Sequence, residues 1–130
     1  MRKEAGMATF GRLLRQARSQ AERSMGELAR HLGVSVVYVS DVENGNRPPF
    51  TKERVLSAAE YLKTDVEPLL AAAAKTRGVF ELDARKVSQK AQEVGAALMR
   101  GWPDLTDEEL EGIEEIVGRS KQRGRDGSQS

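Results

Sequence analysis

The sequence of 130 residues contains no cysteine, only one histidine and no apolar run of membrane-spanning length. Without cysteine, disulfide bonds and thiolate metal sites are excluded, which suits a reducing compartment. His31 has no cysteine and no helical carboxylate partner that fixes a metal geometry, so we expect a surface residue and no metal site. The charged N-terminus is not followed by the hydrophobic segment of a signal peptide. We therefore expect a cytoplasmic protein that makes no membrane contact.

The residue patterns of catalysis are also missing. The chain has no pairing of a nucleophile with a base, no second histidine, no glycine-rich phosphate loop and no paired carboxylates in a predicted cleft. We expect a protein that is not an enzyme and that carries no cofactor.

Acidic and basic residues nearly balance over the whole chain, with 21 Lys/Arg against 20 Asp/Glu, but they are unevenly distributed. Residues 1–77 carry 13 Lys/Arg against 9 Asp/Glu, and residues 78–130 carry 8 against 11. A basic front half is compatible with DNA binding there, although the same division can arise in any two-part protein.

The segment from Ser24 to Gly45 has the pattern of two short helices joined by a tight turn. Ser24 and Ser35 stand where each helix would begin, because a serine hydroxyl can accept a free backbone N–H there. Gly33 falls where the first helix must stop and the chain must turn sharply. The apolar positions at helical spacing are Leu28, Ala29 and Leu32, then Val39 and Val42. This arrangement predicts a helix-turn-helix.

Helical periodicity continues on both sides of that segment, so five short helices are expected within residues 9–77. An Asn-Gly step and paired prolines break the pattern at residues 44–49. Thr51 and Asp65 are the expected caps of the fourth and fifth helices, while Arg12 and Arg15 are interpreted as a solvated face. The other inward positions are Phe10, Leu13, Leu14, Ala17, Val55, Ala58, Ala59, Leu62, Leu69, Leu70, Ala73 and Ala74.

Residues 78–118 form a separate C-terminal extension with two short helices. Residues 79–82 are either an extended connector or one strand. The first helix covers 88–100, with apolar positions at Ala91, Val94, Ala97 and Leu98. The second begins at a capping box formed by Thr106 and Glu109 and has its apolar stripe at Leu110, Ile113, Ile116 and Val117. Residues 1–8 and 119–130 are expected to be disordered tails.

Several short segments resemble the lambda-repressor-like (Cro/XRE) helix-turn-helix family. They are Arg18, Glu27-Leu28-Ala29, Leu32-Gly33-Val34-Ser35, Val39-Ser40 and Val42-Glu43-Asn44-Gly45. The resemblance implies an all-α fold, with a five-helix DNA-binding domain at 9–77 followed by the two C-terminal helices. It also implies binding to operator DNA, usually as a dimer, with helix 35–44 in the major groove. Arg18 and Glu43 match a pair that forms a structural ion pair in the family.

Carried over by position, the base-facing residues are Ser35, Val36, Val37, Ser40 and Asp41. Val36 and Val37 can offer only apolar contact, for which a thymine methyl is the natural target. The alternatives for them are exposure without a role, or contact with a protein. Asp41 can accept from a cytosine amine but is repelled by phosphate. Met25 stands where the family commonly has Gln, and Glu22 and Arg23 replace Gly and Leu.

The predicted DNA-backbone contacts come from residues at helix starts and after the third helix. They are Arg23, Ser24, Tyr38, Asn44, Asn46 and Arg47. Backbone amides at the starts of the second and third helices can also hold phosphates. For Tyr38, a plain surface aromatic is an equally weighted alternative.

Two functions are compatible with these features. The first is a sequence-specific transcriptional regulator, expected to be a repressor, whose residues 79–117 supply homodimerisation or contact with a protein partner. The second is a protein-interaction module, such as an antitoxin or antirepressor, whose DNA binding is autoregulatory or vestigial.

Overall fold

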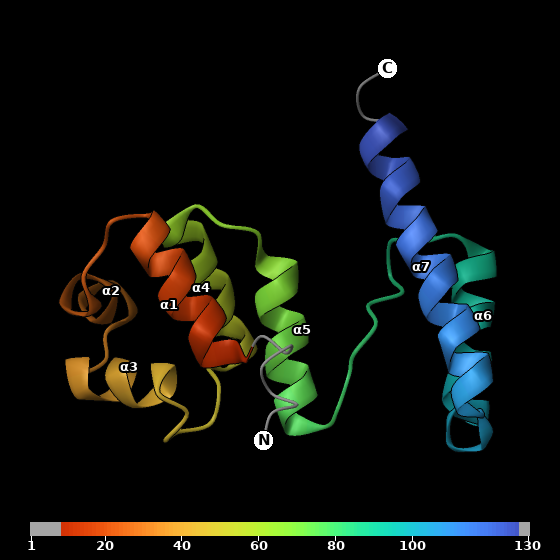
Figure 1. Cartoon of the computed structure of the whole chain (residues 1–130), viewed down its shortest axis with the longest axis horizontal. Coiled ribbons are helices and arrows are strands. Elements are labelled where there is room, and N and C mark those ends of the chain that lie inside the picture. Colours follow the sequence, from red (N-terminus) through yellow and green to blue (C-terminus); the bar gives the residue numbers. More distant parts are fainter. Residues whose placement is uncertain (1–8, 128–130) are drawn as a thin grey trace. The chain divides into compact units, whose positions relative to one another are not determined.

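The computed structural model describes residues 9–127, and every regular element in this range is a helix. The chain divides into two compact units between Glu81 and Leu82, whereas the sequence pattern predicts the division at residue 78. The first unit contains α1 to α5, and the second contains α6, a short 3-10 helix and α7 (Figure 1). The expectation of an all-α fold is confirmed.

Five helices build the first unit, and α2 and α3 are the two helices of the predicted motif. Their bounds are α1 Phe10–Gln20, α2 Met25–Leu32, α3 Val36–Glu43, α4 Lys52–Leu62 and α5 Val66–Arg77. The buried core is Phe10, Leu14, Ala17, Leu28, Ala29, Val39, Val42, Phe50, Val55, Ala58, Ala59, Leu62, Leu69 and Ala73. Phe50 comes from the loop before α4, where no periodicity indicates burial, and its ring lies edge-on to Phe10 at 5.5 Å.

Helix starts in this unit follow the sequence signals with one exception. The hydroxyls of Thr9, Ser24, Ser35 and Thr51 each accept a backbone N–H three residues on. Asp65 occupies the cap position of α5, but its side chain makes no capping hydrogen bond, so that part of the prediction is wrong. Gly33 ends α2 with a φ of 73°, a left-handed conformation that glycine adopts without steric cost.

Helices α1 and α3 cross at Gly11. A Cβ atom at this position would overlap the backbone carbonyls of Val42 and Glu43 at the end of α3. The absence of a side chain at Gly11 therefore sets how closely α1 approaches the second helix of the motif.

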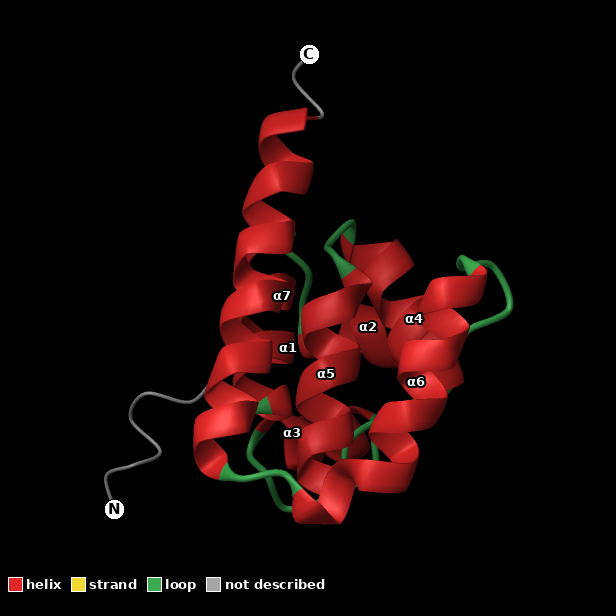
Figure 2. Cartoon of the chain, turned by 90° about the vertical axis from the view of Figure 1, so that its right-hand side faces the viewer, coloured by secondary structure: helices red, strands yellow, loops and turns green. Residues whose placement is uncertain are grey.

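The second unit consists of α6 Gln89–Gly101, the 3-10 helix η2 Trp102–Asp104 and α7 Asp107–Gly127. In Figure 2, α6 and α7 are joined through η2 at one end and diverge from it. None of residues 82–124 is buried, so the apolar stripes of both helices remain at least partly exposed. The predicted capping box is present, because Thr106 and Glu109 exchange side-chain-to-backbone hydrogen bonds of 3.0 and 3.1 Å.

The last helix of this unit is longer than the sequence pattern predicts. Helix α7 has 21 residues and continues to Gly127, so it is not short, and the prediction of disorder is wrong for residues 119–127. Good helix formers such as Arg, Lys and Gln follow Gly118, and basic residues are favourable near a helix C-terminus. Residues 79–82 form no strand and connect the two units. The predicted tails at 1–8 and 128–130 lie outside the described residues.

Candidate nucleic-acid interface

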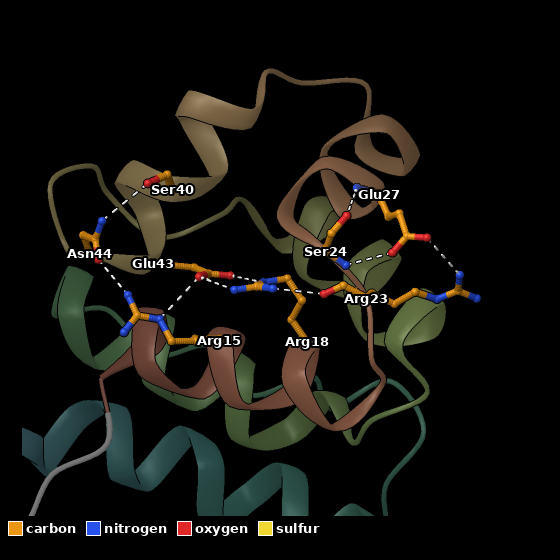
Figure 3. A network of polar contacts seen from close by, with 8 residues as sticks. All are labelled: Arg15, Arg18, Arg23, Ser24, Glu27, Ser40, Glu43 and Asn44. Atoms are coloured by element: carbon orange, nitrogen blue, oxygen red, sulfur yellow. Dashed lines mark hydrogen bonds and ion pairs between the residues drawn. The ribbon is translucent and has the colours of Figure 1, made fainter.

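The orientation of α3 is set by a carboxylate at its inner end. Nε of Arg18 in α1 lies 2.7 Å from Oε2 of Glu43, and Nη2 donates to Oε1 at 3.1 Å (Figure 3). Only 1% of the Glu43 side chain is exposed, and 16% of that of Arg18. The hydrogen bonds that Arg18 donates to the Glu43 carboxylate raise the pKa of Arg18 above its ordinary value. This two-point pairing fixes both the position and the rotation of α3 relative to α1.

Arg15 extends the same network, although the sequence indicates only a solvated face there. Its Nη2 donates to Oδ1 of Asn44 at 2.7 Å, and its Nε lies 3.5 Å from Glu43. The amide nitrogen of Asn44 lies 3.4 Å from the hydroxyl of Ser40 (Figure 3). Asn44 and Ser40, predicted as a backbone and a base contact, therefore both take part in the hydrogen bonding that closes the C-terminal end of α3.

The start of α2 is a complete capping box. The Ser24 hydroxyl accepts from the Glu27 N–H at 3.0 Å, and the Glu27 carboxylate accepts from the Ser24 N–H at 2.8 Å. This backbone hydrogen bond lowers the pKa of Glu27 below its ordinary value. The next two N–H groups, of Met25 and Gly26, have no partner within the helix because they belong to its first turn. They are the backbone donors of α2 that can meet a phosphate.

Arg23 is directed toward α4. Its guanidinium lies 4.9 Å from the ring centre of Tyr61 and 3.8 Å from the carboxylate of Glu27, and its carbonyl accepts from Arg18 at 3.0 Å. The preceding residue, Glu22, has a φ of 57°. Glycine adopts this left-handed conformation without steric cost, whereas a side chain such as that of Glu22 is strained there.

The outer face of α3 carries two exposed valines at its N-terminal end. Val36 is 47% exposed and Val37 is 69% exposed. Ser35, the residue before them, uses its hydroxyl to accept the Tyr38 N–H at 3.0 Å. Of the predicted base-facing residues, Ser35, Val36 and Val37 are exposed, and the two valines make the exposed side-chain surface there largely apolar.

Tyr38 lies between two arginines from different segments. Its ring stacks on Phe50 at 5.8 Å, and the guanidinium groups of Arg47 and Arg54 lie 5.4 and 5.2 Å from its centre. Arg54 also donates to the Tyr38 hydroxyl at 3.0 Å. Sequence reasoning missed Arg54, because nothing in its spacing distinguishes it from any exposed arginine of a fourth helix. The cluster places two positive charges beside α3.

Asp41 carries the negative charge on the outer part of α3, and a loop residue faces it. Nε of Arg47 lies 3.9 Å from its carboxylate, with both side chains partly exposed. The Asp41 carbonyl accepts from the Asn46 N–H at 2.8 Å. The loop after α3 is thereby held beside the helix, and Asn46 and Arg47 both remain exposed.

His31 is an exposed residue with aromatic and polar neighbours. Its ring stacks on Tyr61 at 4.2 Å, and its Nε2 lies 3.2 Å from the hydroxyl of Ser57. No group of three or more potential ligands for a metal ion occurs among residues 9–127. Within the same range, no helix has the length and apolar character needed to span a membrane.

Comparison with known proteins gives three similarities. Residues 9–73 match a family described as "Helix-turn-helix domain". The "Uncharacterized HTH-type transcriptional regulator RghRB" of Bacillus subtilis (strain 168) is 28% identical over 122 residues, which cover 82% of this chain and 87% of that protein. A solved structure of a SinR protein/SinI protein complex is similar over 88% of this chain and 99% of that one, with a TM-score of 0.45 and 17% identity.

Proposed function

The chain belongs to the helix-turn-helix domain family of DNA-binding regulators, and on that premise we propose that it represses transcription by placing α3 in the major groove of an operator. The observation that carries the proposal is the contrast between the two sides of α3. Its inner side is locked to α1 through Glu43 and Arg18. Its outer side presents exposed valines at the N-terminal end, which is the end that enters the groove in this motif.

The exposed valines support recognition of thymine by α3. Val36 and Val37 have no hydrogen-bonding side-chain groups, so they cannot make the bidentate contacts that read purine edges. The thymine methyl is the one apolar group in the major groove. We infer that each half-site carries thymine opposite these valines, and that Asp41 contributes a weaker polar contact.

Contacts to phosphate supply the remaining affinity. Arg47 and Asn46 are exposed next to α3, Arg54 lies beside Tyr38, and the first N–H groups of α2 and α3 have no intrahelical partner. Helix N-termini and arginines are favourable partners for phosphate oxygens. About four such contacts would give a slope of about −4 in a plot of log affinity against log salt concentration.

Recognition by two half-sites would offset weak contacts in each one. We propose that the protein binds as a homodimer in the cytoplasm, with the second unit supplying the contact between subunits. Two linked weak half-sites bind more tightly than either alone because the second contact becomes intramolecular. The support for this role is the second unit itself, in which none of residues 82–124 is buried.

The same observation favours one alternative function. A unit whose apolar residues stay exposed can bind a different protein, as expected of an antitoxin or antirepressor, and DNA binding would then be autoregulatory or vestigial. Exposed large apolar residues in this unit include Met99, Trp102, Ile116 and Val117.

Salt-titrated binding tests the proposed regulator. Full-length protein is titrated with the DNA upstream of its own gene and with random duplex of equal length, between about 50 and 200 mM salt. A preference for the upstream DNA that persists at higher salt supports the regulator. Equal binding to both duplexes at every salt concentration contradicts it.

A further inference from the structure

Helix α7 has its charges divided between its two halves. Residues 107–115 contain six acidic side chains and no basic one: Asp107, Glu108, Glu109, Glu111, Glu114 and Glu115. Residues 119–124 contain Arg119, Lys121 and Arg123 and no acidic side chain. The change of sign occurs at Ile116–Gly118, in the middle of the helix Asp107–Gly127.

The middle of α7 is also apolar and uncovered. Ile116 and Val117 are 57% and 54% exposed, although they continue the stripe that begins at Leu110 and Ile113. Neither α6 nor η2 covers them. An apolar centre flanked by charges of opposite sign is thus available on the described surface of this unit.

The basic half of α7 also lacks a neighbouring helix within its unit. Helix α6 has 13 residues and α7 has 21, which correspond to lengths of about 20 and 31 Å. Figures 1 and 2 both show the C-terminal part of α7 extending beyond the end of α6. A polar helical segment of this size is marginal in isolation, because helices depend on tertiary packing for most of their stability.

We propose that α7 pairs with α7 of a second copy of this chain in antiparallel orientation, with the two-fold axis near Ile116–Gly118. This arrangement places the acidic half of each helix beside the basic half of the other and covers Ile116 and Val117 at the centre. A parallel arrangement would place like charges together, which is unfavourable between neighbouring helices. The contact is isologous and closes after two subunits.

The inference deepens the proposed homodimer by naming its surface and orientation, and it rests on that part of the proposed function only. Binding to a single half-site does not depend on it. A chain that stays monomeric but still prefers its upstream DNA would overturn the α7 contact and leave the DNA-binding proposal standing.

Spin labels test the orientation directly, because the chain has no native cysteine. Gly112 and Gly124 lie on opposite sides of the proposed two-fold axis, and a Cβ atom at either would meet no other atom within 4 Å. Each is replaced by cysteine in a separate full-length variant, and the distance between the two labels of the dimer is measured by electron paramagnetic resonance for each variant alone and for an equimolar mixture of the two.

In the antiparallel pair, a label at residue 112 of one subunit lies beside a label at residue 124 of the other, so the mixture should contain a distance of about 10 Å, the usual separation of packed helices. Two labels at residue 112, or two at residue 124, should be about 20 Å apart, because each position lies about six residues from the centre. A parallel pair would give the short distance in each single variant and the long one only in the mixture. That reversed pattern overturns the proposal.

Charge exchange tests the cause of the pairing. The acidic variant Arg119→Glu/Lys121→Glu/Arg123→Glu and the basic variant Glu111→Lys/Glu114→Lys/Glu115→Lys should each be monomeric alone in sedimentation at low salt. An equimolar mixture of the two should associate again. The exchange Lys90→Glu/Glu93→Lys on α6 is the matched control and should leave the dimer intact, while circular dichroism checks helix content. A monomeric parent chain, a dimer that survives either triple exchange, or a mixture that stays monomeric contradicts the proposal.

Discussion

Arg18 and Glu43, 25 residues apart in the sequence, form two hydrogen bonds that fix α3 on α1, and 1% of the Glu43 side chain is exposed. Removing one partner of a pair this well buried leaves the other charge without compensation. We expect Glu43→Ala to lower the free energy of unfolding by about 3 kcal/mol, measured by urea denaturation. Arg15→Ala should cost less than about 1 kcal/mol, because that side chain is half exposed. Equal losses of unfolding free energy in the two variants would contradict the conclusion that Arg18 is the main partner of Glu43.

The close crossing of α1 and α3 at Gly11 gives a second prediction. A methyl group there would overlap backbone carbonyls, which cannot rotate away as a flexible side chain can. Gly11→Ala should destabilise the protein by about 1–3 kcal/mol despite the higher helix propensity of alanine. Gly112→Ala is the matched control, since the corresponding space in α7 is open, and it should be neutral or stabilising by up to about 1 kcal/mol. Thermal unfolding of the two variants provides the comparison.

The capping box at Ser24 and Glu27 predicts a pH dependence. The pKa of Glu27 is lower in the folded protein than in the unfolded chain, so its contribution is present above the unfolded pKa and is lost as pH falls through the folded pKa. Glu27→Gln should therefore reduce the melting temperature at pH 7. The difference in melting temperature between the variant and the parent protein should narrow below about pH 4, near the pKa of glutamate in the unfolded chain. If the difference in melting temperature stays constant between about pH 3 and pH 7, the ionised carboxylate of Glu27 is not the source of the stabilisation.

The exposed valines of α3 allow a test of thymine recognition. Val36→Ala combined with Val37→Ala should weaken binding to the operator by about 1–3 kcal/mol and leave the fold intact. The loss should be much smaller on an operator in which uracil replaces the facing thymines, because the methyl groups are already absent. Leu56→Ala, at an exposed position of α4, is the control. Unchanged operator affinity of the double variant would refute the contact.

Replacing the two partners of the ion pair between Arg47 and Asp41 should change the affinity for DNA in opposite directions. Arg47→Ala should weaken binding to all duplexes alike and lower the salt slope by about 1, because a phosphate contact is lost. Asp41→Asn removes a repulsive carboxylate and frees Arg47 for phosphate, so it should tighten binding to random duplex by about two- to five-fold at low salt. Glu60→Gln, another exposed acid, controls for net charge. A sequence-selective loss in Arg47→Ala, or weaker binding of Asp41→Asn to random duplex, would contradict these roles.

Local signals in the sequence were sufficient for the helices of the first unit. Serine or threonine at the helix starts, Gly33 at the turn and apolar residues at helical spacing depend only on near neighbours, and the structure follows them. Two predictions that rest on weaker local signals, a helix cap and a helix end, are wrong. Asp65 does not cap α5, and the helix continues past Gly118 because glycine weakens a helix without ending it.

The side-chain partners could not be predicted in the same way, because they depend on how helices pack. The sequence indicates a solvated Arg15, yet this side chain donates a hydrogen bond to Asn44, 29 residues away. No sequence pattern marks Arg54 as a contact residue, yet its side chain, in α4, donates a hydrogen bond to the hydroxyl of Tyr38 in α3. The burial of Phe50, in a loop without periodicity, follows from its position among α1 and α3 rather than from its neighbours in the sequence.

The sequence by itself determined that this is a helical protein with a helix-turn-helix at 24–45, and that the outer residues of its second helix include two valines and an aspartate. These properties follow from capping, turn chemistry and periodicity, which act over a few residues. Only the tertiary structure decided which polar side chains remain free to meet DNA. Asn44 is held by Arg15 of α1 and Arg23 is directed to Tyr61 of α4, and both contacts join segments that are distant in the chain. The valines stay exposed because no other segment of the first unit covers them.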